Sequence, residues 1–341
     1  MRFRQRCSGT DYYLKVQKDS AYNITAMEKI KIGISSCLLG NNVRYDGGHK
    51  WDRYVTDTLG VYFEWVPVCP EVEFGLPIPR EAMHLVGEPA APRLVTIRTG
   101  IDHTDGMLKW ADAKLKDLEN EELCGFIFRS KSPSSGISGI KVYTPSGIPS
   151  HKGTGIFGGA FMRHFPLIPV IDDGRLHDPQ LRENFIERVF VYRRWKDFLK
   201  ISTSIKDLVA FHTEHKLLIL SHSPKHLSAL GKLVADAKQQ DRKELFTRYM
   251  RLLMEGLQFI ATAKKNTNVL LHIAGYFRNF LPPDDKQELL EIIDQYHRQF
   301  VPLIVPIVII NHYVRKFDEP YLKKQYYLRP HPLELMLRNH V

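Results

Sequence analysis

Two kinds of hydrophobic periodicity divide this chain at about residue 178. Before that point, short apolar runs at residues 30–35, 61–68, 94–98 and 123–128 alternate with segments of helical spacing, such as residues 102–118. Strands that alternate with helices favour a parallel sheet with helices on its faces. After residue 178, apolar side chains recur at helical spacing and strand patterns nearly vanish. We therefore predict a Rossmann-like parallel α/β region followed by an all-α region.

The same change of pattern places the predicted boundaries. The first 26 residues are polar and lack periodicity, so residues 1–28 are expected to be a disordered leader or a mispredicted start. We expect an α/β domain at residues 29–175, a helical connector at 176–200 and an all-α domain at 201–341. A glycine-rich segment at 152–160 has no phosphate-loop motif and is expected to be a flexible loop, either ordinary or close to a ligand.

Charge and cysteine content limit the class of protein. The chain of 341 residues carries a net charge of +10, which fits either an anionic partner such as nucleic acid or a solvated basic surface. Four cysteines are too few for a disulfide framework and suit reduced thiols in the cytosol. The longest apolar run, residues 300–310, is about half a membrane span and contains Pro302 and Pro306. We expect a cytoplasmic protein without membrane contact.

Two cysteines stand where predicted strands end. Cys37 follows the run at 30–35, and Cys69, which lies 32 residues later, follows the run at 61–68. The carboxyl ends of parallel strands form the ligand crevice of an open α/β sheet, so both thiols are expected there. They are either inert small hydrophobes or groups that carry chemistry. The sequence lacks the Cys-x-x-Cys pairs of a zinc ribbon, whereas an iron–sulfur cluster can use cysteines from several loops.

The loop after the run at 123–128 is rich in hydroxyl groups. It reads Arg129-Ser-Lys-Ser-Pro-Ser-Ser-Gly136, and such a turn offers hydroxyl and backbone donors. It is expected either to hold an anion or a polar ligand, or to be an ordinary surface turn.

Together, these segments resemble the thiouracil desulfidase family. The similarity covers about residues 29–170 and rests on Ile34-Ser-Ser-Cys37-Leu-Leu-Gly40, Val43-Arg44-Tyr45-Asp46-Gly47, Cys69-Pro70-Glu71, Gly75-Leu-Pro-Ile-Pro79-Arg80 and Lys131-Ser-Pro-Ser-Ser-Gly136. The resemblance implies a 4Fe-4S cluster held by three cysteines. Its open iron would take sulfur from a thiolated uracil and leave uracil and hydrosulfide without net redox change.

The resemblance also implies roles for residues of this chain. Cys37 and Cys69 match the first two cluster ligands. Glu71 matches an acidic residue suited to proton transfer, and Ser132 matches a serine that orients the base or a water. Glu73 would share a face with Glu71 in an extended segment, so only the resemblance separates these two. Further residues are expected to contact the substrate, with structural ion pairs as the alternative for the charged ones: Arg44, Asp46, Arg80 and Ser134.

The sequence departs from the family pattern at Ser135, where the family has its third cysteine. A serine oxygen is a far poorer ligand for a soft cluster than a thiolate. Three outcomes stay open: Ser135 ligates weakly and the cluster is labile, the cluster is lost and the domain only binds a base or nucleotide, or Cys124 supplies the thiolate. Cys124 lies 11 residues before Ser135, inside the preceding strand, a span of roughly 36 Å when extended. We expect its side chain to point elsewhere.

The second half resembles the YbgA-like helical domain, which has no known function and is often fused to a desulfidase domain. The similarity rests on His222-Ser-Pro-Lys225, Leu230-Gly231, Asn268-Val-Leu-Leu-His272-Ile-Ala-Gly275-Tyr276, Pro302-Leu-Ile-Val-Pro306 and Tyr321-Leu-Lys-Lys-Gln325. The sequence lacks the His-Glu-x-x-His pattern of a helical zinc site. The pair His212 and His215 is expected to be solvated or part of a helix cap, and His272 is expected to be buried.

The sequence thus predicts a desulfidase, intact or degraded, that uses a 4Fe-4S cluster on a thiolated pyrimidine base or nucleoside. The alternative is a non-catalytic module without the cluster, which binds a nucleobase or RNA through the same crevice and the basic helical region. A third hypothesis makes the helical half an interaction or dimerisation platform.

Overall fold

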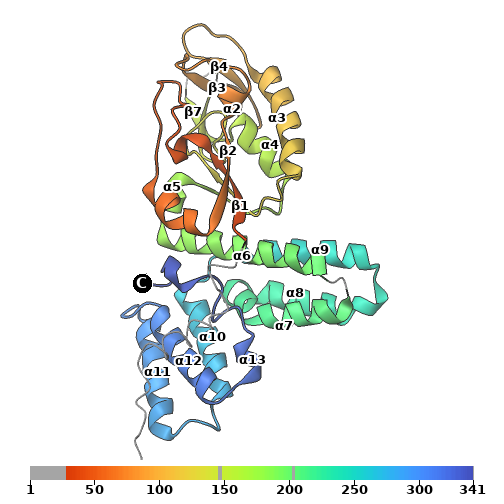
Figure 1. The fold of residues 1–341 in the computed structure, drawn as a ribbon, viewed down its shortest axis with the longest axis vertical. Helices are drawn as coiled ribbons and strands as arrows, with labels where there is room; N and C mark the ends of the chain where they lie inside the picture. The colour runs from red at the N-terminus through yellow and green to blue at the C-terminus, as the bar shows by residue number, and fades with distance from the viewer. Residues whose placement is uncertain (1–27, 145–147, 202–203, 341) are drawn as a thin grey trace, which may run out of the picture.

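The structure, a computed structural model, describes residues 28–144, 148–201 and 204–340. Figure 1 shows the α/β region in the upper part of the view and the helical region in the lower part, with helix α6 (Pro179–Ile201) across the junction between them. Except for Glu28, the expected leader lies outside the described residues. Among the helices of the described ranges, none has the length and apolar character needed to cross a membrane.

The first sheet consists of four parallel strands in the order β2-β1-β5-β8. They are β1 (Ile30–Ser35), β2 (Phe63–Val68), β5 (Phe126–Phe128) and β8 (Val170–Asp172). All three isoleucines of β1 are buried, as are all three residues of β5, which suits central strands covered on both faces. This sheet confirms the predicted parallel α/β fold class, although β5 begins three residues later than the apolar run.

A second sheet, which the sequence analysis did not predict, has the order β4-β3-β6-β7. Its strands are β3 (Met83–Glu88), β4 (Ala91–Thr96), β6 (Ile140–Tyr143) and β7 (Pro149–Gly153). The pairs β3–β4 and β6–β7 are antiparallel, whereas β3–β6 is parallel. The run at 94–98, expected in the parallel sheet, therefore lies in a mixed sheet, because a tight turn after β3 pairs it with its immediate neighbour in the chain.

The helices of the α/β region are α2 (Pro70–Glu73), α3 (Thr104–Glu119), α4 (Ile156–His164) and α5 (Asp173–Leu176). Helix α3 confirms the predicted helix at 102–118 and packs against α4. The expectation of a flexible loop at 152–160 was wrong. The segment completes β7 and then forms the buried first turns of α4, because its glycines allow this helix to pack closely on neighbouring backbone.

Helix α6 belongs to the cores of both regions. Its first half contributes Phe185, Ile186 and Val189 to the hydrophobic cluster that contains the β1 isoleucines. Its second half contributes Val191 and Trp195 to the cluster that fills the helical region. One continuous helix therefore couples the packing of the α/β region to that of the helical region.

The remaining helices form the predicted helical region. They are α7 (Ile205–His222), α8 (Pro224–Ala235), α9 (Arg242–Leu257), α10 (Ala263–Tyr276), α11 (Pro283–His297), α12 (Ile304–Lys316) and α13 (Pro320–Lys323). Two histidine expectations were wrong here. His212 and His215 are buried on α7 rather than solvated, because they lie on the face that packs against Tyr249 and Tyr326. His272 is exposed rather than buried, since it lies on the outer face of α10.

Candidate functional site

The loops at the carboxyl ends of β1, β2 and β5 line a cavity of about 360 Å³. This volume lies within the range of small-molecule binding sites. Most of the candidate site residues line this cavity: Cys37, Arg44, Cys69, Glu71, Arg80, Ser132 and Ser135. Asp46, Ser134 and Cys124 do not line it. The convergence follows from the parallel sheet, whose carboxyl ends share one edge.

Cys37 enters the cavity from a short 3₁₀ turn, Ser36–Leu39, that follows β1 directly. The turn ends at Gly40, whose φ of 91° suits glycine, and the Cys37 carbonyl accepts a hydrogen bond from Lys50 N at 2.9 Å. Burial raises the pKa of the Cys37 thiol to about 11. Without a metal or a cationic partner, this thiol therefore carries its proton at neutral pH.

Cys69 comes directly before α2, and its side chain faces the carboxylate of Glu71. The Sγ atom donates toward Glu71 Oε2 at 3.5 Å. Burial, together with the negative charge of Glu71, raises the pKa of the Cys69 thiol to about 12. Both cavity thiols are thus neutral and buried, a state that a bound metal would have to reverse.

The two glutamates of α2 have separate surroundings, because this segment is a helical turn and not an extended one. Glu71 faces the cavity, where Arg80 Nη2 lies 3.8 Å from its Oε2. Glu73 instead accepts a hydrogen bond from Cys69 N at 2.8 Å and pairs with Lys114 at 2.9 Å. The geometry distinguishes them where spacing alone could not.

A chain of hydroxyl groups runs through the third loop to Glu71. Ser135 N donates to Ser132 Oγ at 3.1 Å, and the Ser132 and Ser134 hydroxyls lie 2.9 Å apart. Ser134 Oγ in turn donates a short hydrogen bond to Glu71 Oε1. Ser134 is fully buried, so its contact is with Glu71 rather than with the cavity. The Ser135 hydroxyl has no hydrogen bond to another described residue.

Two glycines, Gly155 directly before α4 and Gly158 within it, hold the third loop in place, and the sequence analysis gave them no such role. A Cβ atom at Gly155 would lie 2.5 Å from the Ser134 carbonyl oxygen, and one at Gly158 would lie 2.6 Å from the Ser135 carbonyl oxygen. The Ser134 carbonyl accepts hydrogen bonds from the amides of Phe157 and Gly158. The glycine-rich composition of residues 152–160 is the feature of the sequence that could have indicated this close packing.

Arg80 is the cavity residue with the most unused hydrogen-bonding capacity. It follows the cis peptide bond Ile78–Pro79, and its Nη2 donates to the Val43 carbonyl at 2.9 Å. Its side chain is only 6% exposed. Its Nε and Nη1 atoms are buried without a hydrogen-bond partner among the described residues. Buried donors of this kind are normally satisfied, so they favour a bound acceptor in the cavity.

The other charged candidates are held in ion pairs. Arg44 binds Asp46 through two nitrogens at 3.2 Å each, so Asp46 faces Arg44 and solvent instead of the cavity. Arg129, which the sequence analysis did not select, also lines the cavity, binds Asp173 and donates its backbone N–H to Ser35 Oγ. Its position directly after β5, like those of the cysteines after β1 and β2, was the available signal.

Cys124 lies far from these groups. It precedes the amino end of β5, whereas the cavity lies at the carboxyl end of that strand. Its side chain is buried in the hydrophobic core beside the β1 isoleucines, and Sγ faces the Glu122 carbonyl. Cys124 is therefore not among the residues that line the cavity.

Comparisons with known proteins separate the chain into two matched parts. Residues 32–173 match the family described as 2-thiouracil desulfurase. Residues 216–332 match a family described as a protein of unknown function, DUF1722. The uncharacterised protein YbgA of Escherichia coli strain K12 is 33% identical over 133 residues, which are 39% of this chain and 79% of YbgA. A solved structure titled 4Fe-4S-dependent thiouracil desulfidase TudS is 33% identical, covers 46% of this chain and 97% of its own, and has a TM-score of 0.37.

The fold and the cavity define a two-part protein in which an α/β unit with a thiol-lined pocket precedes a helical unit. The chain belongs to the YbgA-related family, with a 2-thiouracil desulfurase domain at its N-terminal side and a DUF1722 domain at its C-terminal side.

Proposed function

We propose that the α/β region removes sulfur from a thiolated uracil or a related thiolated nucleobase, with a 4Fe-4S cluster bound at the cavity. The observation that carries this proposal is the convergence of Cys37, Cys69 and Ser135 on the wall of one cavity, from the loops after β1, β2 and β5. The match of residues 32–173 to the 2-thiouracil desulfurase family supports a desulfidase activity.

The residues of the cavity fit an iron–sulfur cluster at two of its three positions. Cys37 and Cys69 would supply thiolates, and Ser135, whose hydroxyl is not engaged by another described residue, would occupy the third position. The unpartnered nitrogens of Arg80 offer donors to sulfide or to a substrate atom. A serine oxygen binds soft iron poorly, so we propose that the wild-type cluster is labile.

When bound, the cluster would supply a Lewis-acidic iron with an open position suited to sulfur. The overall reaction consumes water. The C=S bond is replaced by C=O, and the sulfur leaves as hydrogen sulfide, so no oxidant or reductant is needed. Glu71 would take the proton of the water on its Oε2 atom, a role supported by the hydrogen bond through which Ser134 holds Oε1. Ser132 would orient the base or the water, and Arg44 and Arg80 would contact the substrate.

Anaerobic reconstitution tests this proposal. We expect the wild type to take up iron and sulfide but to lose them on gel filtration, whereas Ser135→Cys retains close to four irons per chain and shows iron–sulfur charge-transfer absorbance. Cys124→Ser is the matched control and should behave as the wild type. Colourless wild-type and Ser135→Cys proteins would overturn the cluster proposal.

A second candidate is a nucleobase or RNA binding module without a cluster. It is favoured by Ser135 at the third position and by the cations Arg44, Arg80, Arg129 and Lys131 around the cavity. This candidate predicts RNA binding that weakens steeply with salt and does not require iron. Binding that is insensitive to salt would count against it.

The domain limits 29–175, 176–200 and 201–341 remain part of this proposal, as does a cytoplasmic location. The three described cysteines are free thiols, which suits a reducing compartment.

A further inference from the structure

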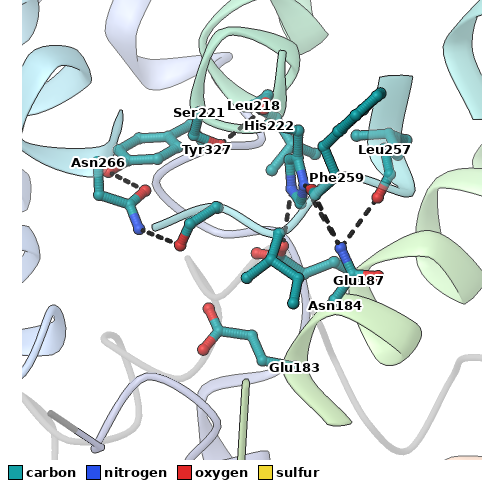
Figure 2. A network of polar contacts seen from close by, with 12 residues as sticks. Glu183, Asn184, Glu187, Leu218, Ser221, His222, Leu257, Phe259, Asn266 and Tyr327 are labelled. Carbon is teal, nitrogen blue, oxygen red and sulfur yellow. Dashed lines mark hydrogen bonds and ion pairs between the residues drawn. The ribbon is translucent and has the colours of Figure 1, made fainter. Parts of the chain in front are cut away.

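A second polar cluster lies where α6 meets the C-terminal segment, away from the cavity described above. Glu183 and Glu187 are four residues apart on α6 and therefore project from the same face of this helix. Figure 2 shows the two carboxylates close to one another, with His222 next to Glu187. Their side chains are 15% and 3% exposed, so both acids are withdrawn from solvent.

Glu187 is well satisfied by its neighbours. Its Oε1 accepts from Arg338 Nη2 at 2.9 Å, and its Oε2 lies 3.1 Å from His222 Nε2. Glu183 has weaker contacts, with Arg338 Nε and His340 Nε2 both 3.4 Å from its oxygens. One guanidinium therefore serves two carboxylates that are both largely buried.

His331 supplies an independent observation that points to a ligand. This side chain is 3% exposed. Its Nδ1 lies 3.1 Å from the Pro332 carbonyl, an acceptor, so Nδ1 carries the proton and Nε2 presents a lone pair. Nε2 is buried without a hydrogen-bond partner among the described residues. Histidines that bind metals typically donate their other ring nitrogen to such a carbonyl.

The three groups converge. One ligand atom from each of Glu183, Glu187 and His331 lies within 4.8 Å of the other two. Neither carboxylate offers a hydrogen-bond donor to this lone pair, whereas a metal cation could accept an electron pair from each of the three groups. The adjoining cavity, lined by both glutamates and Arg338, has a volume of about 50 Å³. His331 does not line this cavity, so the ion would lie at its wall. The space has room for one or two waters but is too small for a nucleobase.

We propose that Glu183, Glu187 and His331 bind one divalent transition-metal ion of the zinc class, which joins α6 to the C-terminal segment. Mixed imidazole and carboxylate ligands suit such ions, whereas magnesium and calcium prefer oxygen ligands alone. Three protein ligands leave a fourth position for water from the adjoining cavity. This site is separate from the proposed desulfidase chemistry and does not depend on it.

Cobalt(II) is the probe, because its visible absorbance reports its ligands. The Cys37→Ser/Cys69→Ser protein serves as the parent, since it removes the cavity thiols as competing ligands. After treatment with a chelator, it should bind one cobalt per chain, with d–d bands and without thiolate charge-transfer absorbance. His331→Gln added to this parent should weaken binding by at least roughly tenfold. His340→Gln, a neighbour outside the three ligands, should leave it within about twofold.

A parent that binds no cobalt would overturn the proposal and leave Arg338 as the sole cation of the cluster. So would a His331→Gln variant that binds as tightly as the parent. Thermal unfolding without metal verifies that the variants fold, and cobalt should raise the melting temperature of the parent but not that of His331→Gln. If His331→Gln does not fold, Glu183→Gln provides the same comparison at a partly exposed residue.

Discussion

The hydroxyl group of Ser134 donates a hydrogen bond to Oε1 of Glu71, although 63 residues separate the two in the sequence. Ser134 is fully buried and does not line the cavity, whereas Glu71 does. Ser134 therefore reaches the proposed chemistry only through Glu71, as a positioning residue. The same carboxylate faces Cys69 Sγ and Arg80 with its other oxygen, so the angle at which Ser134 holds it sets both contacts.

Ser134→Ala should lower kcat of the reconstituted protein with thiouracil by roughly 10- to 100-fold, since a hydrogen bond to a charged group contributes about 1.5–3 kcal/mol. KM and the iron content should change little, because neither depends on the orientation of Glu71. Ser138→Ala, in the same loop but without a hydrogen bond to a described residue, is the control and should match the wild type. Equal kcat values for Ser134→Ala and Ser138→Ala would contradict the positioning role.

Glu71→Gln tests the proton transfer itself. The amide keeps the size and the hydrogen-bonding oxygen of the side chain but cannot take a proton, so we expect kcat to fall by about 100-fold or more. Glu73→Gln, two residues away on α2, is a matched control, since its oxygen can still accept from Cys69 N. Uracil formation and iron content should be measured for both. Comparable losses of kcat in Glu71→Gln and Glu73→Gln would show that α2 contributes to the structure of the site and not to proton transfer.

Part of this site could be predicted from the sequence. Short apolar, strand-like runs indicated β1 and β2, and parallel strands bring their carboxyl ends together, so Cys37 and Cys69 were expected on one crevice. The hydrogen bond from Ser134 to Glu71 could not be predicted, because it depends on how the third loop packs on α4. The second sheet was missed because β7 is polar and offers no apolar pattern. His212 was misjudged because a polar residue on a packed face looks like a solvated one.

The packing of α4 on the third loop leads to a stability prediction. Gly158→Ala places a Cβ atom 2.6 Å from the Ser135 carbonyl and 2.7 Å from that of Gly136, so backbone must move. We expect the free energy of unfolding to fall by about 1–3 kcal/mol. Gly231→Ala on α8 is the opposite control. Its Cβ meets nothing within 4 Å, and alanine favours a helix by about 0.5–1 kcal/mol, so this variant should be stabilised. Urea unfolding measures both, and a neutral Gly158→Ala would mean that the loop shifts at no cost.

The burial of His212 predicts a loss of stability in mild acid. Burial, reinforced by the nearby Lys216, lowers the pKa of this imidazole from 6.5 to about 4. As the pH falls below 6.5, the unfolded chain takes up a proton at His212, whereas the folded protein does not until the pH nears 4. Stability is therefore complete above pH 6.5 and falls toward pH 4, by about 3 kcal/mol in total and about 2 kcal/mol by pH 5.

Urea unfolding at pH 7.5 and pH 5 measures this loss, and His212→Gln isolates the part due to His212. Burial also lowers the pKa of His215 and of His331, so the wild type should lose more than the share of His212 alone. His212→Gln is expected to be less stable than the wild type at pH 7.5, because it disturbs the contact with Tyr249. Between pH 7.5 and pH 5, however, its free energy of unfolding should fall by about 2 kcal/mol less than that of the wild type. His272→Gln, at an exposed position, should follow the wild type. An identical fall for the wild type and His212→Gln would mean that water reaches this imidazole in the folded protein.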